Sequence, residues 1–243
     1  MDGGGRTWMG YRYELHCHTI DGSKCGTMGT TELVEFYHDM GYAGFCITDH
    51  FSGNSTVPDD APWAERVLFY DDIYGKLCDA GNKLGMSVFF GVEMTIYHDI
   101  NSMSAATGND FLLYNLSKDW LLSNRDAFTG RPSDIFAAIR GAGGFIIHAH
   151  PFKEADYIDC IRLYPRSVDA VETFNANSKD FANGFAKTYA QAYGLPETSG
   201  SDFHRRTQKI LTGMETLTPC LSAGDLIEAI KNGRAIPFVI NKD

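Results

Sequence analysis

Short apolar runs alternate with helical patterns along this chain, and most of the runs end at a histidine or a carboxylate. Such alternation is typical of repeated βα units around a parallel sheet. The C-terminal ends of parallel strands meet at one face of the fold, so side chains at these ends converge from distant parts of the sequence. We therefore expect a barrel-like α/β fold with a group of imidazoles and carboxylates at that face.

The predicted elements follow from hydrophobic periodicity and from end signals. We expect strands at residues 12–15, 44–48, 87–92, 111–114, 144–149, 170–173, 196–200 and 237–240. We expect helices at residues 30–40, 63–84, 134–140, 180–193 and 226–231. Ser222 and Asp225 have the spacing of a capping box before the last of these helices. Residues 52–62 and 98–109 are rich in turn-forming residues and are predicted to form loops over the site.

Length and charge narrow the class of protein. A chain of 243 residues without a repeat or a shift in composition predicts one domain over residues 1–243. A net charge of −10 argues against binding to long nucleic acids, which rests on clustered Lys and Arg. It is compatible with a small phosphorylated substrate, because bound divalent cations reverse the local field. No apolar stretch has the roughly 20 residues that span a bilayer, and no export signal is visible, so we expect a cytoplasmic protein without membrane contact.

The two-residue spacing of His16 and His18 predicts that their side chains point in the same direction. Alternate residues of an extended segment point the same way, so His16 and His18 can face one metal while Cys17 points away. Asp49 should point away from His50 and orient a ligand through a hydrogen bond. Further candidate ligands stand at or beside other predicted strand ends: Glu93, Asp110, His150, Asp202 and His204.

Five segments around these residues occur in a recognisable order. They are Glu-Leu-His-Cys-His-Thr, Ile-Thr-Asp-His, Gly-Val-Glu, His-Ala-His-Pro and Gly-Ser-Asp-Phe-His. Together they resemble the motifs of the polymerase-and-histidinol-phosphatase (PHP) domain family, from about Tyr13 to about His204. The resemblance implies a distorted (βα)7 TIM-like barrel with a metal cluster, commonly of three ions, at the strand C-terminal face, and in many members phosphoester hydrolysis.

The resemblance also implies a ligand set. His16, His18, Glu93 and Asp202 correspond to the ligands of one metal, and Glu93 would bridge to a second. The second metal would also take His150 and Asp110, which stands where many relatives have histidine. The third would take His50, His204 and a residue of the loop after His18; Lys24 lies near the family position, so Asp21 or Cys25 would supply that ligand. Mixed nitrogen and oxygen donors suit zinc, manganese or iron, two or three ions per chain.

A metal centre of this kind requires no side-chain nucleophile. Adjacent metals clamp phosphoryl oxygens and lower the pKa of a bound water. We expect Glu93, Asp202 and His204 to be the catalytic residues, the last two by handling protons. Lys24, Arg205 and Arg206 are the candidate phosphate-binding cations nearest in sequence to the site.

Other polar residues are interpreted as structural. His38 should lie on a helix surface, and Glu14 should have a structural role. His38 and His98 match no family motif, and His98 begins a predicted loop where it could line the pocket. His148, the first histidine of His-Ala-His-Pro and two residues before His150, is a candidate auxiliary ligand or proton relay.

Several functions stay open. The leading hypothesis is a metal-dependent phosphoesterase acting on a small metabolite, either a monoester or a nucleotide-derived diester. Alternatives are histidinol phosphate phosphatase, a non-catalytic metal-binding regulatory PHP domain, and an amidohydrolase-like enzyme that cleaves a carbon–nitrogen bond. The sequence indicates no oligomeric state.

Overall fold

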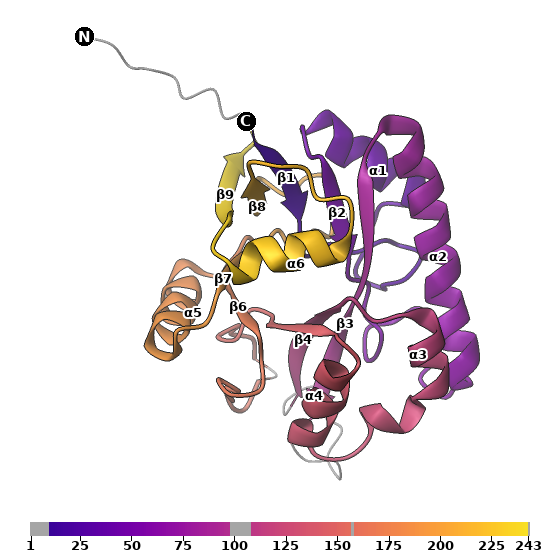
Figure 1. The fold of residues 1–243 in the computed structure, drawn as a ribbon, viewed down its shortest axis with the longest axis vertical. Helices are drawn as coiled ribbons and strands as arrows, with labels where there is room; N and C mark the ends of the chain where they lie inside the picture. The colour runs from indigo at the N-terminus through magenta and orange to yellow at the C-terminus, as the bar shows by residue number, and fades with distance from the viewer. Residues whose placement is uncertain (1–9, 98–107, 157, 243) are drawn as a thin grey trace.

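A nine-stranded sheet curls into a nearly closed barrel at the centre of the computed structural model, which describes residues 10–97, 108–156 and 158–242 (Figure 1). The order of the strands in the sheet is β7-β6-β5-β4-β3-β2-β1-β8-β9. Their bounds are β1 Tyr11–Glu14, β2 Gly44–Ile47, β3 Ser87–Tyr97, β4 Gly108–Tyr114, β5 Phe145–His148, β6 Ala170–Asn175, β7 Glu197–Gly200, β8 Ile210–Thr216 and β9 Ala235–Asn241. The fold is thus a distorted TIM-like barrel, as expected.

The barrel closes just beyond the ends of β1 and β7. Cys17 and Phe203 form a parallel bridge there. The amide of His18 donates to the carbonyl of Phe203 at 3.0 Å, and the amide of Phe203 donates to the carbonyl of His16 at 3.0 Å. Glu14 strengthens this closure, because its buried carboxylate accepts from the amides of His16 and Ser201 at 2.9 and 2.8 Å. The structural role predicted for Glu14 is confirmed.

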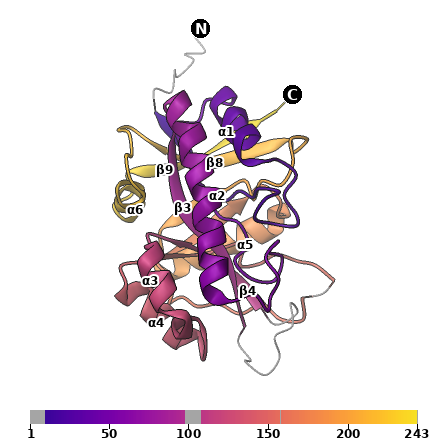
Figure 2. The same cartoon turned by 90° about the vertical axis from the view of Figure 1, so that its right-hand side faces the viewer.

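Helices cover the outside of the barrel and one of its ends. The helices are α1 Thr30–Asp39, α2 Trp63–Leu84, α3 Lys118–Ser123, α4 Pro132–Gly141, α5 Asp180–Tyr193 and α6 Ala223–Lys231, with a 3-10 turn at Arg125–Phe128. The long α2 runs along one side of the molecule (Figure 2). The predictions for residues 63–84 and 180–193 are confirmed to the residue, and the other three predicted helices differ only at their ends.

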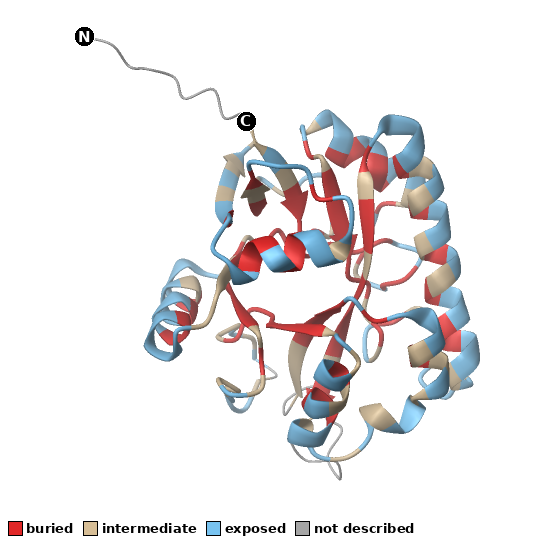
Figure 3. Cartoon of the chain, viewed as in Figure 1, coloured by how far each residue is buried: buried red, intermediate tan, exposed pale blue. Residues whose placement is uncertain are grey.

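Apolar side chains fill the barrel and the spaces under the helices. Helix α6 lies across the ring of strands (Figure 1) and places Leu226 and Ile230 in the same core as Tyr13, Phe145 and Met214. The strands are buried over most of their length, and the helices alternate buried and exposed stripes (Figure 3). A core of this kind leaves the opposite end of the barrel to polar residues.

Two features of the sheet correct the sequence-based expectation. β4 is antiparallel to both β3 and β5, so the sheet is not built from parallel βα units throughout. β3 also continues to Tyr97, and Glu93 lies inside the strand instead of at its end. The reason is that period-two alternation persists past Glu93: Met94 and Ile96 are buried on one face, which favours an extended chain. β8 and the short α3 were not predicted, and Gly108 and Asn109 belong to β4 instead of a loop.

The capping box at the start of α6 is confirmed and gives a first test. The Ser222 hydroxyl accepts from the amide of Asp225 at 3.2 Å, and the Asp225 carboxylate accepts from the amide of Ser222 at 2.9 Å. Ser222→Ala should lower the free energy of unfolding by about 1 kcal/mol, measured by urea denaturation, because α6 loses its N-cap. Ser133→Ala, on the exposed surface of α4, is the matched control and should change it by less than about 0.5 kcal/mol. Equal effects of the two variants would contradict the capping role.

None of the helices within the described residues combines the length and the apolarity of a membrane-spanning segment.

Candidate metal centre

Eight candidate ligands predicted from the sequence meet at one end of the barrel. They form four groups, and within each group the potential ligand atoms lie within 4.8 Å of one another. The groups are His16–His18–Glu93, His16–His150–Asp202, Glu93–Asp110–His150 and His18–His50–His204. The fold therefore brings together side chains from six separate segments of the chain.

The bridge that closes the barrel also orients the first ligands. Cys17 and Phe203 are fully buried in the core under α1 and α2. Because alternate residues of an extended chain point in opposite directions, His16, His18 and Asp202 point into the site. The Nε2 atoms of His16 and His18 lie 3.4 and 3.3 Å from Asp202 Oδ1.

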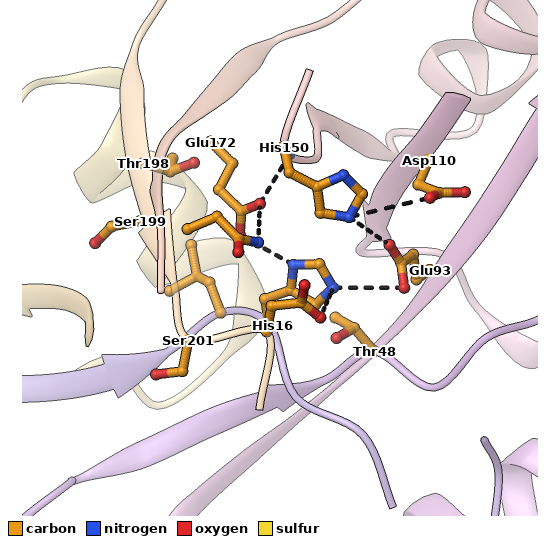
Figure 4. A network of polar contacts seen from close by, with 12 residues as sticks. His16, Thr48, Glu93, Asp110, His150, Glu172, Thr198, Ser199 and Ser201 are labelled. Carbon is orange, nitrogen blue, oxygen red and sulfur yellow. Dashed lines mark hydrogen bonds and ion pairs between the residues drawn. The ribbon is translucent and has the colours of Figure 1, made fainter. Parts of the chain in front are cut away.

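Glu93 occupies the centre of the cluster. A second bridge, between His50 and Glu93, extends the pairing of β2 with β3 beyond the end of β2. The two Glu93 oxygens face different histidines. Oε2 lies 3.4 Å from His16 Nε2 and Oε1 lies 3.2 Å from His150 Nε2 (Figure 4). Oε2 also lies 3.0 Å from His50 Nδ1. A carboxylate placed in this way fits the role of a bridge between two ions.

The donor set fits metal ions better than it fits hydrogen bonding. His16 Nε2 and Glu93 Oε2 are fully buried, and neither makes a hydrogen bond with any described residue, although both lie in the ion-pair contacts given above. Buried polar atoms are rarely left without a partner. A cation between these two atoms would satisfy both, and the mixture of imidazole and carboxylate suits zinc, manganese or iron.

The electrostatics of the cluster favour positive charge. Burial alone would raise the pKa values of Glu93 and Asp202, but the neighbouring histidines hold both well below the usual range. Burial would lower the pKa of His16, yet Asp202, Glu172 and Glu93 raise it well above its usual value. For His18, burial dominates and lowers the pKa to about 3. The carboxylates are thus ionised and His18 is neutral, which are the forms that bind metals.

Two of the ligands sit on unusual backbone. His150 has φ 25° and Asp202 has φ 47°, a region that residues other than glycine rarely adopt. Such conformations cost of order 1–3 kcal/mol each and cluster at functional sites, where the surrounding structure holds them in place. His150 and Asp202 therefore have strained backbone conformations at the positions where they join the cluster.

Glu172, on β6, holds two of the ligands and was not predicted from the sequence (Figure 4). Its Oε1 lies 3.0 Å from His16 Nδ1, and its Oε2 accepts from the amide of His150 at 2.9 Å. A carboxylate on Nδ1 fixes the tautomer that leaves Nε2 free to bind a metal. Gly200 permits this contact, since a Cβ there would lie 2.4 Å from Glu172 Oε1 and 2.5 Å from His16 Cβ. One sequence signal was present: a charged residue in an otherwise uncharged strand, Ala-Val-Glu-Thr-Phe-Asn.

Asp49 acts on His18 through Ser23. The Ser23 hydroxyl donates to Asp49 Oδ1 at 2.8 Å and accepts from the amide of His50 at 2.9 Å. Its oxygen also lies 3.2 Å from His18 Nδ1. Because the hydroxyl hydrogen is used on Asp49, Nδ1 must be the donor, and Nε2 of His18 is left as the metal-binding nitrogen. Asp49 thus contacts a candidate ligand through Ser23, which is consistent with the orienting role expected for it.

Replacing Glu172 gives a second test. Glu172→Gln should lower metal affinity 10- to 100-fold, because His16 loses the carboxylate that orients its ring. Metal affinity is measured by competition with a chromogenic chelator. Glu197→Gln, on neighbouring β7 and partly exposed, is the matched control and should bind metal as the unmodified chain does. Unchanged affinity in Glu172→Gln would remove Glu172 from the support of the site.

Asp21 does not join the cluster, which corrects the third set of predicted ligands. The chain turns after Thr19, so the exposed Asp21 carboxylate accepts from the amide of Thr30 at 3.2 Å, at the start of α1. His18 instead completes the group with His50 and His204. Cys25 belongs to none of the four groups, although it lines the pocket above them.

A pocket of about 630 Å³, which we call the metal pocket, is lined by the ligand candidates His50, Asp110, His150 and His204. The predicted phosphate-binding cations lie outside it. Lys24 and Arg205 are exposed and do not line it. Arg206 is 3.7 Å from Glu32 and stacks on Phe36. Lys153, which sequence reasoning missed, does line the pocket, and its charge helps to lower the pKa of Asp202. The signal available was its position three residues after His150.

The three remaining histidines of the chain are His38, His98 and His148. His38 lies on the surface of α1 beside Asp39, as predicted. His98 lies outside the described residues. His148 is buried, stacks on Phe111 at 4.8 Å and belongs to none of the four groups; burial lowers its pKa to about 3. His148 nevertheless lines the metal pocket, and neither of its ring nitrogens makes a hydrogen bond within the described residues, so its role as an auxiliary ligand or proton relay stays a prediction.

Comparison with known proteins gives likenesses of fold. No family model and no curated protein matches the sequence. A two-domain protein from Bacteroides vulgatus ATCC 8482, described as containing a predicted PHP-like metal-dependent phosphoesterase, superposes with a TM-score of 0.69 at 17% identity over 95% of this chain. The chain spans 65% of that protein, just under two thirds of its length.

Two further solved structures have similar folds. A candidate metal-dependent phosphoesterase from Bifidobacterium adolescentis ATCC 15703 has a TM-score of 0.54 at 18% identity, over 90% of this chain and 95% of its own. An amidohydrolase from Chromobacterium violaceum, solved with bound sulfate and no metal, has a TM-score of 0.55 at 17% identity, over 93% and 97%. The molecule therefore belongs to the class of distorted TIM-like barrels. Within that class, it has the PHP-like fold that its sequence motifs predicted.

Proposed function

We propose that this chain is a metal-dependent phosphoesterase of the PHP family that hydrolyses a small phosphorylated metabolite. The observation that carries the proposal is the convergence of Glu93 and seven other imidazole and carboxylate side chains, two of whose buried ligand atoms make no hydrogen bond within the described residues. The two structural neighbours described as metal-dependent phosphoesterases, one of them PHP-like, support it. Divalent ions bound there would supply charge neutralisation of the phosphoryl oxygens and activation of water.

The residues of the chain itself bind and orient. His16, Glu93 and Asp202 would hold one ion, and Glu93, Asp110 and His150 a second. His18 has one free ring nitrogen, Nε2, so it would complete either the first site or a third site with His50 and His204, but not both. Lys153 lines the pocket and is placed to attract the phosphate. Glu172 and the Ser23–Asp49 pair keep the histidine rings in the ligating tautomer. Their contribution is a preorganised site.

His204 can act as a ligand or as a proton donor, but not as both at once. Its Nδ1 lies 2.6 Å from the carbonyl of Asp202, to which it donates, so Nε2 is the one nitrogen left for metal or substrate. Burial lowers its pKa, which favours the neutral ring. We favour the ligand role, in which Asp202 and water handle protons.

The proposal is tested by elemental analysis of the purified protein and by hydrolysis of p-nitrophenyl phosphate and bis-p-nitrophenyl phosphate. The assays are run after chelation and again with zinc, manganese or iron restored. We expect two or three metals per chain and turnover that returns with metal; the preferred ester then identifies a monoesterase or a diesterase. Bound metal without turnover of any ester would favour a regulatory role, and a protein that binds no metal would contradict the proposal.

Two narrower alternatives have their own readouts. Asp59, an exposed carboxylate that lines the pocket without belonging to the metal groups, could pair with a substrate amine, which is the feature expected for histidinol phosphate phosphatase. Histidinol phosphate is therefore included as a substrate. The likeness to an amidohydrolase makes ammonia or amine release the second readout; release of amine without phosphate would favour cleavage of a carbon–nitrogen bond.

A further inference from the structure

A second cavity, which we call the annex, adjoins the metal pocket. It has a volume of about 460 Å³ and shares four lining residues with the pocket: Gly53, Asp59, Thr95 and Tyr97. Cavities of 300–1,000 Å³ are typical of small-molecule sites. The annex is thus large enough for a ring and continuous in its lining with the metal centre.

The walls of the annex are largely aromatic and aliphatic. Trp63 packs against Phe51 with ring centroids 5.3 Å apart and against Phe128 at 5.2 Å, and Met94 and Ile96 of β3 add aliphatic surface. The Trp63 indole N–H is bonded to the carbonyl of Leu121 at 2.6 Å, so that polar group is already satisfied.

The charge of Arg66, which also lines the annex, is satisfied too. Its guanidinium donates to the carbonyls of Phe51 and Pro58 at 2.7 and 2.6 Å. The other two charged residues of the lining, Asp59 and Arg125, are exposed to solvent. The more buried part of the wall therefore selects an apolar group, and its aromatic faces favour a flat one.

The metal ligands and the annex are built on the same two segments. Phe51 follows His50 directly and Gly53 comes two residues later, and Met94 to Tyr97 follow Glu93. Thr95, which borders both cavities, donates to Oδ1 of the ligand Asp110 at 2.6 Å. A ligand group in the annex is therefore held at a position fixed relative to the metal centre.

Gly53 leaves space where the two cavities meet. It has φ +70°, and a Cβ there would lie 3.8 Å from Thr95 Oγ1 and 4.0 Å from the Tyr97 hydroxyl. A larger side chain would therefore crowd the residues that border both cavities, whereas glycine both adopts this backbone and leaves space.

We propose that the annex binds an apolar, aromatic part of the substrate's alcohol while the phosphate lies at the metal centre. The inference rests on the proposed phosphoesterase function and narrows its substrate class to phosphoesters that carry a ring on a short linker. Both binding of phosphate by the metal centre and burial of the ring in the annex then contribute to recognition.

The test separates binding from turnover by using non-hydrolysable phosphonates. Calorimetry with the metal-loaded full chain compares propylphosphonate with phenylalkylphosphonates whose linkers have one to four methylene groups. At least one phenyl compound should bind about tenfold more tightly or better, since even a single methylene in an apolar pocket is worth about tenfold. Ala61→Trp, which fills the annex from its lining, should reduce this ratio to about one, and Leu217→Trp, on an exposed loop, should leave it unchanged.

If Ala61→Trp does not fold, Thr129→Trp at the exposed rim of the annex replaces it. Equal affinity for propyl and phenylalkyl compounds, or a ratio that survives the filling of the annex in a folded variant, would overturn the inference. Turnover of the corresponding phosphates is measured in parallel. Hydrolysis without a preference for the ring contradicts the annex alone, whereas a binding preference without hydrolysis of any ester contradicts the phosphoesterase function alone.

Discussion

Glu93→Gln should reduce metal-dependent kcat/KM by about a thousandfold or more and lower the number of bound metals, while the fold is kept. The amide preserves the shape of the side chain but removes the charge that faces His16, His50 and His150 at the centre of the cluster. Metal ions stabilise a transition state by several kcal/mol, and each 1.36 kcal/mol corresponds to a factor of ten in rate. The measurements are elemental analysis, circular dichroism and steady-state kinetics on the preferred ester.

The controls for this variant lie on α1. Glu35→Gln removes the same charge from an exposed position, and His38→Ala removes an exposed imidazole. Both should bind metal and turn over substrate as the unmodified chain does. Intact activity in Glu93→Gln would exclude Glu93 from the metal centre, and an unfolded variant would be followed by Glu93→Asp, for which a partial loss of metal is expected.

Removal of metal should lower the free energy of unfolding by about 4 kcal/mol for each tightly bound ion, relative to protein with free metal at about a thousand times its Kd. The physical reason is that metal binds the assembled cluster, which exists only in the folded chain, so binding stabilises the native state. Urea denaturation with chelator and with added zinc or manganese measures the difference.

Glu93→Gln is the control for this second prediction. Its unfolding curve should respond much less to chelation, because the central ligand is already weakened. Identical unfolding curves for the unmodified chain with and without metal would show that the cluster holds no ion in the native state.

Helix ends and the directions of neighbouring side chains depend on short segments of sequence, and these features could be predicted. Helix α2 is bounded by Trp63 after a proline and by Gly85 in the left-handed region, both of which are sequence signals. The ligands His16 and His18 follow β1 on an extended segment, so their common orientation depends only on the alternation of side chains. For the same reason Cys17, between them, was expected to point away, and it lies in the core.

Other features depend on pairings between distant segments. Glu172 meets His16 across 156 positions of sequence, and their contact depends on the close approach that Gly200 permits. The direction of β4 depends on its pairing with β3, which extends well past Glu93. No local pattern encodes either contact.

The sequence by itself determined which residue types would bind metal and that they would stand at or near strand ends, because strand alternation and side-chain chemistry are properties of short segments. The tertiary structure alone decided that Asp21 turns towards α1 and that Lys153 lines the pocket. It also decided that Thr95 and Gly53 border a second cavity beside the metal centre. These outcomes follow from closure of the barrel between β1 and β7, which sets the distances between segments that have no contact in the unfolded chain.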